Sequence, residues 1–403
     1  MLFGKPSDFS DRDYRSRNYK GNWTKHFINN YVDSMISIGK ERTLDTFSNY
    51  KDEHLPKYLY KFMPPTIYSL NNIIQGTIHL SSPQKFNDPF DSYLCVNSEC
   101  FIREYVLSEF IKKGYVKNVE ESKEFITNSE FWAINYSQCE GENKHYGNKS
   151  FSTTFYEITY SKSESFGRVC REIHYEAQKT LNYKMKLLRN DMFKISCFSC
   201  FKDEDELMQN TMMWSHYADE HRGYCVKYLL NLNESIFRNI LLCGLFPINY
   251  TSRTEIITPK QLLDLKEMNG ELNINDNLKK KIIKSLLTKS RFWNYEKEWR
   301  LILSEKECHL LYENNIPFLK IDSIYLGCRI DKSIEQLIIK LGEKLDFNVF
   351  KTRQSDKKYI LEYSQFDIKR QTEAEYYYML SKIGNIEDRS ERNRVLRFIN
   401  SKE

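Results

Sequence analysis

Strand-like and helical segments follow one another irregularly along this 403-residue chain, and this irregularity limits the folds open to it. The segments YLYKF (58–62), TIHLSS (77–82) and YCVKYLL (224–230) contain neither proline nor glycine and are typical of strands. Helical stretches of unequal length separate them, without the regular alternation of parallel α/β proteins. The pattern predicts an α+β fold, with a mixed or antiparallel central sheet of short strands and packed helices.

Changes in composition divide the chain into three predicted parts. Residues 1–55 are polar, charged and rich in Tyr and Asn, which indicates an N-terminal extension. Residues 56–365 hold the strand-like segments and form the predicted core domain, with a helical insertion at 100–192. Residues 366–403 are predicted to form a charged helical tail.

Bulk composition excludes several classes of protein. Hydrophobic residues make up 40% of the chain, enough for a packed core. With 60 basic and 55 acidic residues, the charge is too balanced for a protein that wraps nucleic acid. Glycine is sparse, and no phosphate-binding GxxxxGK or GxGxxG is present, which argues against P-loop and Rossmann enzymes.

Targeting signals are also missing from the sequence. The first 20 residues have no apolar signal core, and no apolar run approaches about 18 residues. Ten cysteines are scattered without the spacing of a disulfide framework. We therefore expect a cytoplasmic protein that does not associate with membranes.

The stretch MMWSHYADEHRGYCVKY (212–228) concentrates aromatic, basic and acidic side chains. It predicts a helix that ends at Gly223, followed by a strand. One interpretation is a helix packed on a sheet; the other is one wall of a binding pocket. Under the second interpretation, the candidate pocket residues are Trp214, His216, Tyr217, Arg222 and Tyr224.

Two further stretches carry candidate site residues. In FNDPFDS (86–92), Asn87 and Asp88 either hold a turn or, with Asp91, face a ligand. In FWNYEKEWRLIL (292–303), strand geometry places Glu298 and Arg300 on one face. That pair is either an exposed ion pair or a desolvated carboxylate suited to proton or hydroxyl chemistry, with Glu296 beside it. A lone CxxC at 197–200 lies in a predicted strand, so no metal site is expected.

Four ordered blocks together resemble the bacterial family named domain of unknown function 2971. They are LYKF with LSSPQKFNDPFDS, then ISCFS, then the 212–228 stretch, then FWNYEKEWRLIL followed by IYLG. The resemblance covers about residues 57–330. It implies a component of mobile elements or phage-defence loci, with a toxin or effector role.

A more distant resemblance is to the ADP-ribosyltransferase fold of abortive-infection proteins and DNA-targeting toxins. It implies an NAD-using enzyme with Glu298 as the catalytic carboxylate and Lys61 at the first polar position, where His or Arg is usual. Tyr217 or Tyr224 would form an aromatic wall. The implied acceptor is a nucleic acid or a protein, and a defence-system partner is possible. The full set of expected site residues adds Glu296 and His216 to the catalytic group, with Tyr60, Asn87, Asp88, Trp214, Arg222 and Arg300 around the pocket.

Two other hypotheses remain open at this stage. A metal-assisted nuclease would use Asp88, Asp91, His216, Glu296 and Glu298. A non-enzymatic sensor or interaction protein would use the same blocks only for packing.

Overall fold

A computed structural model describes residues 23–38, 43, 54–112, 164–190, 192–231, 244–268, 271–304, 307–308 and 314–365. The chain divides into two compact units. Unit 1 comprises residues 1–85, 193–250 and 289–403, and unit 2 comprises residues 86–192 and 251–288. The predicted core domain at 56–365 is therefore divided between two units, and the predicted tail at 366–403 lies outside the described residues.

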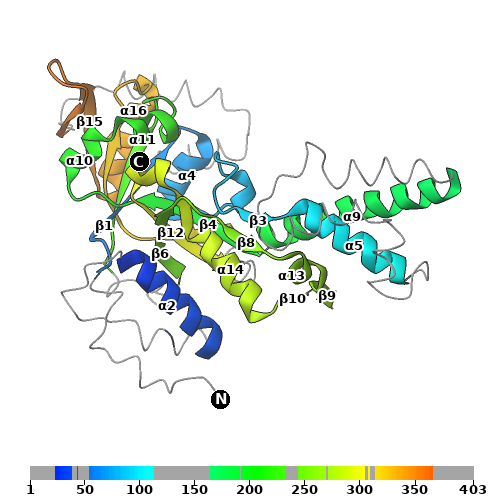
Figure 1. The fold of residues 1–403 in the computed structure, drawn as a ribbon. Helices are drawn as coiled ribbons and strands as arrows, with labels where there is room; N and C mark the ends of the chain where they lie inside the picture. The colour runs from blue at the N-terminus through cyan, green and yellow to red at the C-terminus, as the bar shows by residue number, and fades with distance from the viewer. Residues whose placement is uncertain are drawn as a thin grey trace. The chain divides into compact units, whose positions relative to one another are not determined.

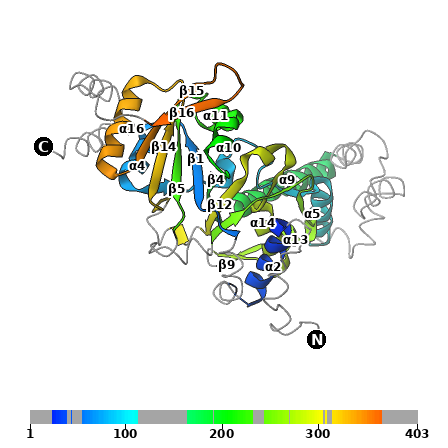
Figure 2. The same cartoon turned by 90° about the vertical axis from the view of Figure 1, so that its left-hand side faces the viewer.

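Unit 1 is built on a mixed eight-stranded sheet (Figures 1 and 2). Its strand order is β16-β15-β14-β5-β1-β4-β12-β6. The strands are β1 (Tyr58–Met63), β4 (Phe193–Ser199), β5 (Tyr224–Leu229), β6 (Leu245–Pro247), β12 (Glu298–Ser304), β14 (Ile321–Leu326), β15 (Asn348–Gln354) and β16 (Leu361–Gln365). Within this sheet only β14 and β15 pair in parallel, so the prediction of an α+β fold with a mixed sheet is confirmed.

Helices cover both faces of this sheet, as Figure 2 shows. On one face, α4 (Ile67–Gln75) and α16 (Lys332–Leu345) pack with Leu59, Val226 and Leu301. On the other, α10 (Glu204–Gln209) and α11 (Thr211–Tyr217) pack with Tyr60, Phe62 and Tyr325. Side chains of successive strand residues alternate between these two cores. We call them the α4/α16 face and the α10/α11 face.

Local sequence explains where several of these helices begin and end. Thr66 and Ser69 form a capping box at the start of α4, and Gly76 ends it with a left-handed φ of 62°. Asp203 accepts a hydrogen bond from the Glu206 amide and so caps the start of α10. The short β2 (Thr77–His79) that follows α4 pairs with β13 (Asn315–Pro317).

The predicted N-terminal extension contributes a helix to unit 1. In α2 (Trp23–Ile38), Phe27, Tyr31 and Val32 are buried. The ring of Tyr31 lies edge-on to that of Phe246 in β6, with centroids 5.3 Å apart. This helix therefore belongs to the hydrophobic core at the β6 end of the sheet.

Unit 2 is mainly helical. It contains α5 (Ser98–Lys112), α9 (Glu164–Asn190), α13 (Pro259–Leu263) and α14 (Asp276–Leu286), together with the strand pairs β3 (Leu94–Val96) with β8 (Glu255–Ile257) and β9 (Lys266–Met268) with β10 (Glu271–Asn273). The Lys184 ammonium donates to the carbonyls of Leu262 and Leu263, both at 2.8 Å, and so joins α9 to the end of α13. Among the described helices of both units, none is long and apolar enough to cross a membrane.

Candidate active site

The first residue of β12, Glu298, is the centre of a buried ionic cluster on the α10/α11 face of unit 1. Its carboxylate accepts hydrogen bonds from Arg300 Nε at 2.6 Å and from Arg300 Nη2 at 3.1 Å. Arg300 is fully buried and Glu298 is only 4% exposed. Residues two apart on a strand share a face, so the predicted Glu298–Arg300 pair forms, and it is a desolvated pair rather than an exposed one.

Lys289 joins a second carboxylate to this pair. Its ammonium lies 3.0 Å from Glu298 Oε2 and 2.5 Å from Glu296 Oε2. The Tyr217 hydroxyl donates to Glu296 Oε1 at 2.6 Å, and the backbone amide of Glu298 donates to the Tyr250 hydroxyl at 2.8 Å. Two carboxylates thus share one ammonium inside the protein. We call Glu296, Glu298, Lys289 and Arg300 the ionic cluster.

A left-handed residue allows both carboxylates to face Lys289. Glu296 is the last residue of the 3-10 helix η4 (Arg291–Glu296), and Lys297 has φ 47° and ψ 50°. The Lys297 carbonyl accepts a hydrogen bond from the Cys200 amide at 3.0 Å, and its ammonium pairs with Glu206. These contacts fix the turn between η4 and β12, and this turn sets the spacing of the Glu296 and Glu298 carboxylates.

The two carboxylates of the cluster have opposite shifts in pKa. Burial, and then the neighbouring charge of Glu298, raise the pKa of Glu296 to about 7. Burial opposes ionisation of Glu298 too, but Arg300 and Lys289 outweigh it and hold its pKa well below the usual range. Near neutral pH, Glu298 is therefore ionised while Glu296 is partly protonated, a separation typical of acid–base pairs.

The raised pKa of Glu296 predicts a pH-dependent stability. The folded protein keeps a proton that unfolded chains release between about pH 4.5 and about pH 7, so the free energy of unfolding falls as pH rises through this window. Relative to a Glu296→Gln variant, we expect the wild type to lose on the order of 2–3 kcal/mol across it. Urea unfolding of both proteins at several pH values measures the difference. Parallel pH profiles would contradict the shift.

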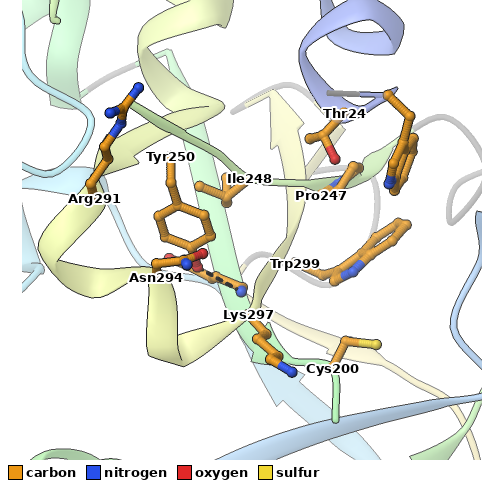
Figure 3. A pocket seen from close by; sticks show the side chains of 11 residues that line it. Thr24, Cys200, Pro247, Ile248, Tyr250, Arg291, Asn294, Lys297 and Trp299 are labelled. Carbon is orange, nitrogen blue, oxygen red and sulfur yellow. Dashed lines mark hydrogen bonds between the residues drawn. The ribbon is translucent and has the colours of Figure 1, made fainter. Parts of the chain in front are cut away.

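A pocket of about 550 Å³ opens beside the cluster, and Glu298 is one of its lining residues. Figure 3 shows Arg291 and Trp299 on opposite sides of it, with Lys297 and Cys200 at a third. Trp23 of α2 and Trp299 of β12 lie with ring centroids 6.5 Å apart. The pocket is lined by Trp23, Thr24, Cys200, Pro247, Ile248, Tyr250, Arg291, Asn294, Lys297, Glu298 and Trp299. Its size and its mixed aromatic, basic and amide lining suit a polar small molecule.

The structure places Lys61 on the other face of the sheet from Glu298, although the charge of Glu298 still opposes the lowering of the Lys61 pKa by burial. On β1, Lys61 alternates with Tyr60 and Phe62 and lies on the α4/α16 face, whereas Glu298 lies on the α10/α11 face. The Lys61 ammonium donates to Ser196 Oγ at 2.9 Å and to the Cys197 carbonyl at 3.0 Å. The expectation that Lys61 faces the same site as Glu298 is therefore corrected, because strand alternation points it into the opposite core.

Three predicted aromatic pocket residues are core residues instead. Tyr60 is buried in the α10/α11 core, and Tyr224 is buried in the α4/α16 core. Trp214 is fully buried, and its Nε1–H donates to the Leu207 carbonyl at 3.3 Å. None of these three lines the 550 Å³ pocket. For them the packing interpretation of the sequence is the better description.

The remaining predicted residues fall in different places. His216 is exposed on α11, and its ring lies near those of Tyr217 and Trp293, with centroids 6.3 and 6.0 Å apart. It thus flanks the ionic cluster without lining the pocket. Arg222 is exposed and pairs with Asp219 and Glu220.

Asn87, Asp88 and Asp91 belong to unit 2. The Asp88 carboxylate accepts a hydrogen bond from the Phe90 amide at 2.9 Å, which is the predicted turn-holding role. Within the described residues, no group of three or more His, Cys, Asp or Glu side chains is arranged to hold a metal ion.

The stretch 212–228 contains an unusual backbone turn. The helix α11 ends at Tyr217 rather than at Gly223, because Asp219, Glu220 and His221 all have left-handed φ values of 47°, 53° and 68°. The Gly223 amide donates to the Ala218 carbonyl at 2.7 Å and closes the turn. Beyond β14, the amides of Gly327 and Arg329 donate to the carbonyls of Gly223 and His221 at 2.8 and 3.0 Å. The dense motif thus serves in part to support a strained connection.

Nothing in the sequence points to two members of the site, Lys289 and Tyr250. Lys289 lies seven residues before Glu296, in an ordinary lysine-rich context, and only its burial distinguishes it. Tyr250 lies three residues beyond the end of β6 and meets Glu298 through the pairing of β6 with β12. Both reach the cluster through tertiary structure alone.

Comparison with known proteins gives one match. No curated protein and no solved structure matches the chain. Residues 213–301 match the model of the family described as "Protein of unknown function (DUF2971)". The matched segment begins in α11 and ends in β12, so it spans Tyr217, Lys289, Glu296, Glu298 and Arg300. Through this segment, the chain is similar to the DUF2971 family.

Proposed function

We propose that this protein is an ADP-ribosyltransferase-like enzyme that cleaves the nicotinamide–ribose bond of NAD. The proposal is carried by one observation: the carboxylate-bearing residue Glu298 lines a pocket of about 550 Å³ that also presents aromatic rings and cations. Arg300 and Lys289, rather than solvent, keep the Glu298 carboxylate ionised.

The chemistry follows from the charge that develops during bond cleavage. When the ribose C1′–N bond breaks, its electron pair leaves with nicotinamide and positive charge grows on the ribose. A fixed carboxylate stabilises that charge, and it can accept hydrogen bonds from the ribose hydroxyls. An acceptor hydroxyl or amine then bonds to C1′ and releases its proton to solvent. Glu298 is the catalytic residue in this scheme, and Lys289, Glu296 and Tyr217 are positioning residues.

The pocket lining suits the other parts of NAD. The indole rings of Trp23 and Trp299 provide faces for an aromatic ring. Arg291, exposed at the rim, is suited to bind the pyrophosphate through paired N–H groups.

The biological setting is part of the same proposal. We propose a cytoplasmic effector of bacterial defence or toxin action, with a nucleic acid or a protein as the acceptor. Support comes from the family resemblance at 213–301.

Release of nicotinamide from NAD tests the proposal. We expect Glu298→Gln to lower the rate by about 100-fold or more, because a preorganised charge on the reacting centre is lost. Glu335→Gln is the matched control: Glu335 is also 4% exposed and pairs with Lys351 at 2.8 Å, but it lies on α16 and does not line the pocket. Thermal melting of each variant verifies folding.

An exposed rim residue provides a second test that does not depend on the stability of the cluster. We expect Arg291→Gln to raise KM for NAD by about tenfold with little change in kcat. The proposal fails if the folded wild type releases no nicotinamide, or if Glu298→Gln and Glu335→Gln retain equal activity.

A further inference from the structure

A second pocket, of about 620 Å³, lies in unit 1 between α11 and the loop that joins β15 to β16. Figure 2 shows this loop beside α11. The loop is closed by a hydrogen bond from the Ser355 amide to the Ile360 carbonyl, at 3.1 Å. None of the residues that line this second pocket also lines the 550 Å³ pocket. The second pocket is lined by Thr211, Ser215, His221, Gln354, Ser355, Asp356, Lys357, Lys358, Tyr359, Ile360 and Leu361.

A serine–histidine pair forms the α11 side of this pocket. Ser215 Oγ lies 3.2 Å from His221 Nε2 and also donates to the Thr211 carbonyl at 3.1 Å. When the serine proton is directed to the carbonyl, the Nε2–H tautomer of His221 can donate to Oγ. The exposed Ser215 hydroxyl can turn from the carbonyl to a ligand oxygen without breaking the contact with His221. The pair therefore offers a hydroxyl donor held in place by a histidine.

The opposite side of the pocket is basic. Lys357 and Lys358 are both exposed, and neither forms an ion pair with another residue that the structure describes. The charge of Arg329 reaches the pocket as well, since burial and then Arg329 lower the pKa of His221. Asp356 is the one carboxylate among the lining residues. Among the charged lining residues two lysines thus outnumber one carboxylate, a balance that favours an anion.

An unpacked aromatic ring lies in the same loop. Tyr359 lines the pocket and its side chain is fully exposed. A fully exposed tyrosine ring in a surface loop adds little packing energy to the fold, whereas its π face can stack on a nucleobase. The ring and the two lysines belong to consecutive residues, so one ligand can meet both.

We propose that this pocket binds a phosphorylated nucleoside, with its phosphate on Lys357, Lys358 and Ser215 and its base on Tyr359. The site does not depend on the proposed NAD chemistry, because the two pockets share no lining residue. Phosphate recognition by ammonium and hydroxyl donors is charge-assisted and strong, and stacking adds the selectivity for a nucleoside.

Isothermal titration of the full-length protein with AMP and, separately, with inorganic phosphate tests this site. We expect a Lys357→Gln/Lys358→Gln variant to bind AMP at least about tenfold more weakly than the wild type. Tyr359→Ser is expected to weaken AMP binding by about tenfold while leaving phosphate binding unchanged. Lys320→Gln is the matched control, since Lys320 is an equally exposed lysine just before β14, outside the pocket.

A further variant separates the two pockets. Arg291→Gln alters only the 550 Å³ pocket, so AMP binding that survives it supports the second site. The proposal is overturned if the wild type binds neither AMP nor phosphate, if the double lysine variant binds AMP as well as Lys320→Gln does, or if Arg291→Gln alone abolishes binding.

Discussion

Replacing Arg300 with methionine is expected to lower the free energy of unfolding by about 3–5 kcal/mol. The guanidinium is fully buried and makes two hydrogen bonds to the Glu298 carboxylate. Without it, Glu298 keeps a negative charge in a site 4% exposed, and it shares the Lys289 ammonium with Glu296. Urea unfolding followed by circular dichroism measures the loss.

An exposed arginine provides the control. Arg353 pairs with Glu362 at 2.6 Å, but its side chain is 72% exposed, so Arg353→Met should cost less than about 1 kcal/mol. Combining Arg300→Met with Glu298→Gln should recover at least about 1 kcal/mol, because the unpaired charge is removed. Equal losses for Arg300→Met and Arg353→Met would mean that the cluster contributes no more than a surface pair.

Replacing Gly327 with alanine is expected to destabilise the protein by about 3 kcal/mol or more. A Cβ at this position would lie 2.2 Å from the His221 carbonyl oxygen and 2.7 Å from that of Gly223. Both oxygens belong to the left-handed turn after α11, and both accept hydrogen bonds from the segment that follows β14. Because the obstacle is backbone, the turn must move as a whole, and with it the α11 end near Tyr217.

Alanine at Gly76 separates this steric effect from the cost of a left-handed backbone conformation. Gly76 has φ 62°, yet no atom lies within 4 Å of a Cβ built there. Gly76→Ala should therefore cost about 1–2 kcal/mol, from the left-handed conformation alone. Thermal melting of both variants compares them directly. If Gly76→Ala and Gly327→Ala lower the stability equally, the close approach of the two segments is not the reason that position 327 needs a glycine.

Several elements of the fold follow from neighbouring residues. The strands at β1, β5 and β12 lie where aromatic and β-branched residues run without a breaker, and a glycine, Gly76, ends α4. The shared face of Glu298 and Arg300 also follows, because a two-residue repeat is local. These features depend on the nearest few side chains, which any reader of the sequence can see.

Other features depend on distant segments. The helix end was predicted at Gly223, but it lies at Tyr217, because amides more than 100 residues further along hold a left-handed turn. Lys61 was expected beside Glu298, but the sheet places them on opposite faces, with β4 between their strands. A strand's own residues reveal which side chains share a face, but not which core each face joins.

By itself, the sequence determined the positions of strands β1 and β5 and the alignment of Glu298 with Arg300. Only the tertiary structure decided that Lys289 and Tyr217 meet Glu296, that Tyr250 meets Glu298, and that Trp23 lies near Trp299. The reason is physical. Backbone propensity and side-chain alternation are properties of a short segment, whereas the partner of a buried charge is set by strand order and by the packing of residues far apart in the chain.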